Sequence, residues 1–118
     1  YFRRQTLATE AWQPRVEALE KQVGELQSQL DLRTKELAYM YIHSNWTLIR
    51  WYLIRQQDIH GEASDTYAQA KNAETLIDRQ LTRHLRDVHF ELDAMEVAYA
   101  WRRETTVTLT QNGFTFFD

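Results

Sequence analysis

The fold of this chain is decided by the stretch Val16–Met40, which reads VEALEKQVGELQSQLDLRTKELAYM. Its apolar residues recur at alternating steps of three and four, with one polar interruption at Arg33. We call this set the seam; it consists of Val16, Leu19, Val23, Leu26, Leu30, Leu37 and Met40. The spacing is the a/d pattern of a heptad repeat, which forms one narrow apolar stripe along a helix. Because a helix cannot bury such a stripe against itself, the seam predicts a partner helix, from the same chain or from a copy.

The number of helices in the predicted coiled coil is left open between two and three. Valine at a with leucine at d, as in Val16 and Leu19, favours parallel dimers, whereas the aromatic residues after Met40 favour more neighbours. The flanking positions offer one attractive pair between copies, Arg15 with Glu20. The other flanking residues are mostly uncharged, namely Gln22, Gln27, Gln29 and Thr34.

The block Tyr39–Ile54 is apolar around much of a helical circumference, which predicts enclosure by several helices. Trp46 and Trp51 are therefore expected in a core or a subunit interface. His43, Asn45 and Arg50 interrupt the block, which disfavours a membrane span and hence a membrane role. For Arg50 we expect an acidic partner such as Asp87 or Glu91.

A second helix is predicted over Asp65–Glu104, where apolar residues repeat at steps of three and four. Gly61 is expected to end the first helix in the left-handed conformation, and Ser64 or Asp65 to cap the second. Because the connection is short, the second helix should return antiparallel along the first.

The tail 105–118 changes to a period of two. Asn112-Gly113 between the runs Thr106–Gln111 and Phe114–Phe117 predicts a two-residue β-hairpin. In that register Val107, Leu109, Phe114 and Phe116 share one face. A lone hairpin is marginally stable in water, so this face should dock on the helices or its edges should pair with other copies.

Composition and motifs argue against several functions. The formal charge is −3 and no cluster of Lys or Arg forms a basic stripe, which argues against nucleic-acid binding. There is no cysteine, no Gly-x-Ser-x-Gly elbow and no phosphate-binding glycine loop, so we expect neither an enzyme nor a cofactor. His84, Asp87 and Glu91 share one helical face, but no Glu-x-x-His motif accompanies them, and no metal site is expected.

The sequence thus predicts a mainly α chain: a long coiled-coil helix plus an antiparallel helical hairpin, with a C-terminal β-hairpin. Its segments are a lead-in (1–13), a coiled coil (14–38), a helical hairpin bundle (39–104) and the β-hairpin (105–118). The expected function is structural homo-oligomerisation within a larger fibrous or virion-type assembly, with copies of itself and further protein subunits as partners. The alternatives are an intracellular coiled-coil adaptor for a different protein and, third, a small enzyme or sensor that uses the histidines. The predicted interface comprises the seam with Trp46, Trp51, Leu109, Phe114 and Phe116.

Overall fold

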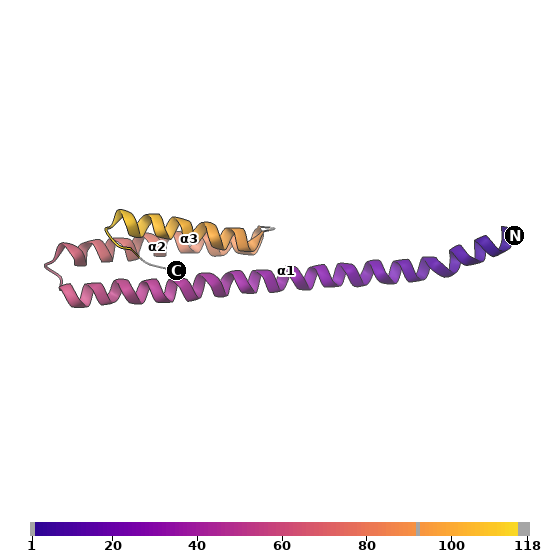
Figure 1. Cartoon of the computed structure of the whole chain (residues 1–118), viewed down its shortest axis with the longest axis horizontal. Helices are drawn as coiled ribbons and strands as arrows, with labels where there is room; N and C mark the ends of the chain where they lie inside the picture. Colours follow the sequence, from indigo (N-terminus) through magenta and orange to yellow (C-terminus); the bar gives the residue numbers. More distant parts are fainter. Residues whose placement is uncertain (1, 92, 116–118) are drawn as a thin grey trace. The chain divides into compact units, whose positions relative to one another are not determined.

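Three helices account for nearly all of the structure, a computed structural model that describes residues 2–91 and 93–115. They are α1 (Phe2–His60), α2 (Asp65–Phe90) and α3 (Ala94–Gln111), and no strand occurs in the described residues (Figure 1). The predicted mainly α class is therefore correct. The chain divides into two compact units: unit 1 ends at Arg33 and unit 2 begins at Thr34.

From Ala11 to Arg33, unit 1 is a single helical segment without a core of its own. Helix α1 begins at Phe2 and contains Pro14 inside it, so the helix extends through the predicted lead-in. Every residue from Ala11 to Arg33 is exposed. Because isolated helices gain most of their stability from packing one face on a partner, this segment lacks its usual source of stability within the protomer.

Unit 2 is a bundle of three helices: the part of α1 after Arg33, then α2, then α3. Gly61 ends α1 with φ 75°, and the Ser64 hydroxyl caps α2 by accepting from the Tyr67 N–H at 3.0 Å, as predicted. Hydrogen bonds join Gln57 to Glu74 (2.8 Å) and Tyr39 to the Leu85 carbonyl (3.5 Å). Since the numbers rise on one helix as they fall on the other, α2 runs antiparallel to α1.

The second helix is shorter than predicted. It ends at Phe90 instead of continuing to Glu104, and after a break between the two helices α3 begins at Ala94. The Asp93 carboxylate accepts a hydrogen bond from the Glu96 N–H at 3.1 Å and caps α3. An aspartate followed three residues later by glutamate is a helix-start signal, which an apolar period that continues across the break conceals.

The predicted C-terminal β-hairpin is wrong, because residues 105–111 belong to α3. Asn112-Gly113 ends this helix instead of turning a hairpin: Gly113 has φ 85°, its N–H bonds to the Thr110 carbonyl, and the Phe114 N–H bonds to the Leu109 carbonyl. These two bonds define a Schellman motif, in which glycine supplies the left-handed residue after the helix. Leu109 and Phe114 are both buried, as the apolar contact of this motif requires.

The threonines of the tail are accommodated in a helix by hydrogen bonds to their own backbone. The hydroxyls of Thr106, Thr108 and Thr110 each donate to the carbonyl four residues earlier, at 2.9–3.1 Å. Such bonds are open to β-branched hydroxyl residues in helices. Val107 is exposed while Leu109 is buried, so the side chains follow a helical period and not the predicted shared strand face.

The core of unit 2 draws on all three helices. Tyr41 contacts the Tyr99 ring edge-on, and Tyr52 contacts Phe114 in the same way, so α3 runs parallel to α1. Helix α3 is antiparallel to α2, since Asn72 bonds to Asn112 and Arg83 to Glu104. The buried apolar residues are Ala38, Ile42, Trp46, Ile49, Leu53, Ala70, Ala73, Ile77, Val88, Ala94, Ala98, Trp101, Leu109 and Phe114.

Candidate interaction surface

The seam residues of unit 1 are exposed. Val16, Leu19, Val23, Leu26 and Leu30 are each between 44 and 66% exposed. Between successive turns lies a shallow recess of about 350 Å³, lined by Val16, Leu19, Glu20, Val23, Gly24 and Gln27. A recess between a and d side chains is the feature that accepts a side chain of a facing helix in knobs-into-holes packing.

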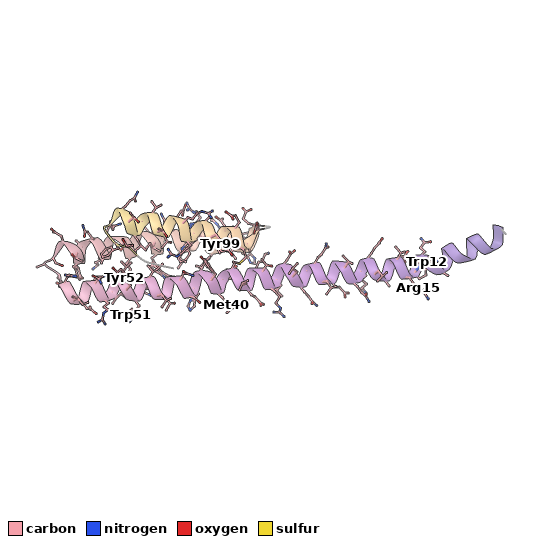
Figure 2. The ribbon with its side chains drawn as sticks, in the orientation of Figure 1. Trp12, Arg15, Met40, Trp51, Tyr52 and Tyr99 are labelled. Carbon is pink, nitrogen blue, oxygen red and sulfur yellow. The ribbon has the colours of Figure 1, made fainter. Side chains whose placement is uncertain are left out.

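In unit 2, helix α1 has two apolar faces. One is buried against α2 and α3 and comprises Ala38, Ile42, Trp46, Ile49 and Leu53. The other is exposed and comprises Leu37, Met40, Leu48, Trp51 and Ile54. Figure 2 shows Trp51 pointing away from α2 and α3, and its neighbour Tyr52 pointing toward them. Trp51 and Ile54 lie 14 residues after Leu37 and Met40, so the exposed face keeps the heptad register of the seam.

The two edges of this exposed face differ in polarity. The edge toward α2 carries Arg50, whose Nε lies 3.5 Å from the Glu74 carboxylate. The partner of Arg50 is thus Glu74 of α2 and not the predicted Asp87 or Glu91. The same carboxylate accepts a hydrogen bond from Gln57, so this part of α2 lies beside Arg50. The edge toward α3 carries Tyr41 and Leu48. On the exposed face itself, the Arg55 guanidinium carbon lies 5.5 Å from the centroid of the Trp51 ring.

Three of the residues predicted for the interface, Trp46, Leu109 and Phe114, are buried inside unit 2 of the same protomer. Phe116, which was also predicted for the interface, lies outside the described residues. The hairpin face that grouped Leu109 with Phe114 does not exist. The seam and Trp51 remain exposed.

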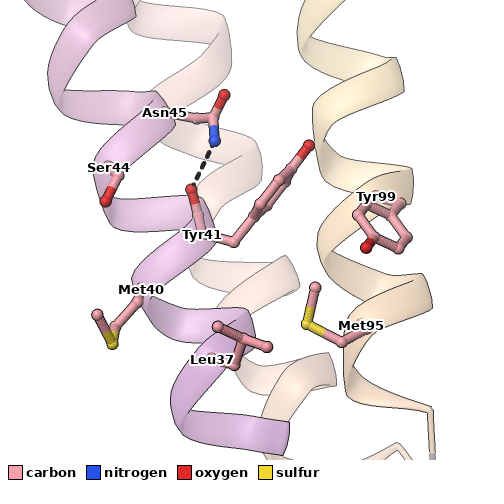
Figure 3. A pocket seen from close by; sticks show the side chains of 7 residues that line it. All are labelled: Leu37, Met40, Tyr41, Ser44, Asn45, Met95 and Tyr99. Carbon is pink, nitrogen blue, oxygen red and sulfur yellow. Dashed lines mark hydrogen bonds between the residues drawn. The ribbon is translucent and has the colours of Figure 1, made fainter. Parts of the chain in front are cut away.

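Sequence reasoning missed the contribution of α3 to this surface. A groove of about 450 Å³ between α1 and α3 is lined by Leu37, Met40, Tyr41, Ser44, Asn45, Met95 and Tyr99 (Figure 3). Met95 and Tyr99 fit the apolar period of the predicted second helix (Asp65–Glu104), so they were expected to belong to its apolar face. The available signal was the capping pattern at Asp93 and Glu96, which starts a third helix and turns their face toward α1.

The polar cluster around Glu104 is paired within unit 2. Glu104 accepts hydrogen bonds from Arg83 at 2.9 and 3.2 Å, and its carboxylate lies 2.6 Å from Nε2 of the buried His84. This cluster joins α2 to α3 and is a structural contact between them. Over the described residues, no group of three or more side chains is arranged to hold a metal ion.

No helix in the described residues is both long and apolar enough to cross a membrane. No protein-family model, curated protein or solved structure matches the chain.

Proposed function

We propose that this chain is a structural homo-oligomerisation module whose copies associate through the heptad seam of α1. The observation that carries the proposal is in unit 1: every residue from Ala11 to Arg33 is exposed, and the seam residues Val16, Leu19, Val23, Leu26 and Leu30 lie along one heptad stripe. Burying a valine or leucine side chain is worth about 1.5–3 kcal/mol. Pairing of the stripe would therefore provide the stabilisation that this segment lacks by itself.

The chemistry of the seam favours a second copy as the occupant. When two identical helices align in parallel, each a or d residue packs beside the same residue of the other copy. The a layers then contain only valine (Val16, Val23) and the d layers only leucine (Leu19, Leu26). Parallel alignment also brings Arg15 of one copy to Glu20 of the other, an attractive pair. The other flanking residues, Gln22, Gln27, Gln29 and Thr34, are uncharged and introduce no repulsion between copies, whereas Arg33 places like charges opposite each other at one d position.

The proposed interface contains fewer elements than the one expected from the sequence. Pairing of β-hairpin edges between copies is not proposed, because no strand occurs in the described residues. In addition, α3 closes the helical hairpin into a three-helix bundle, so unit 2 buries its inner face within one protomer. The outer face of α1 stays exposed.

The test is the molar mass of the full chain in solution, measured by sedimentation at micromolar concentration. We expect a dimer or trimer for the parent, and a shift toward monomer for Leu26→Asp, which introduces a charge into the seam. Leu32→Asp is the matched control, because Leu32 is also an exposed leucine of unit 1 but lies off the seam. A monomeric parent would refute the proposal and favour an adaptor that uses its seam for a different protein.

A further inference from the structure

We infer that a second copy of this chain docks against α3 as well as α1, in the groove between these two helices of unit 2. The inference rests on the proposed self-association and adds a surface to it. Met95 and Tyr99 of α3 form one wall of the groove, and Leu37 and Met40 of α1 form the other. Figure 3 shows Met95 extending from α3 toward α1, and Tyr41 lying between the two helices.

One ring contact joins the two helices at the groove. The Tyr41 and Tyr99 rings meet edge to face, with centroids 5.4 Å apart. The Asn45 side chain donates to the Tyr41 carbonyl at 2.8 Å, so its amide is held against α1 and the opening stays clear of it. Tyr99 nevertheless remains 44% exposed, so part of this residue is available to a partner.

The identity of the partner follows from the position of the groove on the heptad. Leu37 and Met40 are seam residues, so a helix that pairs with the seam in register passes over them. The side chains that a parallel copy brings to this level are its own Leu37 and Met40. None of the residues that line the groove is charged, so an identical copy meets no repulsion there.

The difference between the edges of α1 predicts the side to which the second copy leans. The edge toward α2 is occupied by the Arg50–Glu74 ion pair, which would lose solvation if covered. The edge toward α3 offers Tyr41, Tyr99 and Met95. Tyrosine and methionine are enriched in the centres of protein interfaces. The second copy therefore gains more contact area by leaning toward α3.

The experiment measures the dissociation constant of the full chain by sedimentation for Tyr99→Ala and for Val107→Ala. Both residues are exposed on α3, but Val107 does not line the groove. We expect about a tenfold increase in the dissociation constant for Tyr99→Ala, which corresponds to about 1.4 kcal/mol, and no change for Val107→Ala. An unchanged constant for Tyr99→Ala, while Leu26→Asp still dissociates the assembly, would overturn the inference and leave the proposed function intact. No effect from Leu26→Asp would refute the proposed function instead.

A second measurement covers the case in which Tyr99→Ala loses helicity. A photoreactive benzoylphenylalanine placed at Tyr99 should cross-link to the Leu37–Thr47 segment of a different copy, which mixing of isotopically labelled and unlabelled chains identifies. The same probe at Val107 should give no such product. Cross-links confined to single chains at Tyr99, in a sample shown to be oligomeric, would contradict docking against α3.

Discussion

Ile49 and Trp51 lie two residues apart on α1 and have opposite surroundings. Ile49 is fully buried among the three helices of unit 2, whereas Trp51 is 62% exposed. A helix that packs on its protomer through a single face usually carries polar residues on the opposite face. Here both sides of α1 are apolar: the inner one holds the protomer together, and the outer one is available to another chain.

The two faces predict different consequences for two tryptophans of the same helix. Trp46→Ala removes a buried ring from the core and should lower the free energy of unfolding by about 3–5 kcal/mol. Trp51→Ala removes an exposed ring and should leave the folding of a dilute, monomeric sample within about 0.5 kcal/mol of the parent, while weakening self-association. Denaturant unfolding and sedimentation measure the two effects separately. If Trp51→Ala destabilised the monomer as strongly as Trp46→Ala, Trp51 could not belong to an outer face.

Much of the fold could be predicted because heptad and helical periods are local signals. The helix stop at Gly61, the cap at Ser64 and the antiparallel return of α2 all follow from residues within a few positions of each feature. The Arg50 partner could not be predicted, because the axial register between α1 and α2 is set by packing of the whole bundle. The exposure of Trp51 could not be predicted for the same reason. The sequence shows a wide apolar block in α1, but not which side of that helix α2 and α3 cover.

The tail was mispredicted because the same residues suit two structures. Alternating threonines and an Asn-Gly pair are typical of hairpins, yet Thr106, Thr108 and Thr110 satisfy their hydroxyls within a helix, and glycine after a helix is equally typical of a Schellman motif. The deciding contacts are tertiary. With the helix continuing to Gln111, Leu109 and Phe114 both reach the core of unit 2.

Substitution by alanine should have opposite effects at two glycines, because Gly113 has a positive φ in the Schellman motif and Gly24 lies inside a helix. Gly113→Ala forces a β-carbon onto a residue at φ 85° and should lower the free energy of unfolding by about 1 kcal/mol. The cost is conformational, since the nearest atom to the new carbon, Gln69 Oε1, lies at an ordinary 3.8 Å. Gly24→Ala, inside α1 with nothing within 4 Å, should raise helix stability by about 1 kcal/mol. Thermal unfolding followed by circular dichroism measures both, and a stabilising Gly113→Ala would contradict the helix cap.

Two adjacent threonines of α3 provide a matched pair for buried polar groups. Thr105 is fully buried, and its hydroxyl has no hydrogen-bond partner among the described residues. Thr105→Val, which keeps the shape and removes the hydroxyl, should leave stability unchanged or raise it by about 1 kcal/mol. Thr106→Val should lower stability by about 0.5–1.5 kcal/mol, because its hydroxyl donates to the Arg102 carbonyl and accepts from the Arg102 guanidinium. Denaturant unfolding decides the order; a large loss at Thr105 would mean that its hydroxyl is bonded in solution.

The register of the seam through unit 2 predicts the effect of changing a serine to leucine. Ser44 is exposed and lies seven residues after Leu37, so it occupies an a position in the centre of the proposed interface. Ser44→Leu replaces a hydroxyl with an apolar side chain there and should lower the dissociation constant at least about tenfold, since burying a leucine is worth about 1.5–3 kcal/mol. Ser28→Leu is the control, because Ser28 is exposed on α1 but lies off the seam, where its hydroxyl donates to the Gly24 carbonyl at 3.0 Å. Sedimentation of the two variants distinguishes position from hydrophobicity. Equal tightening by both would indicate non-specific apolar association, whereas tightening by Ser44→Leu alone requires that a partner lie over the heptad positions of unit 2.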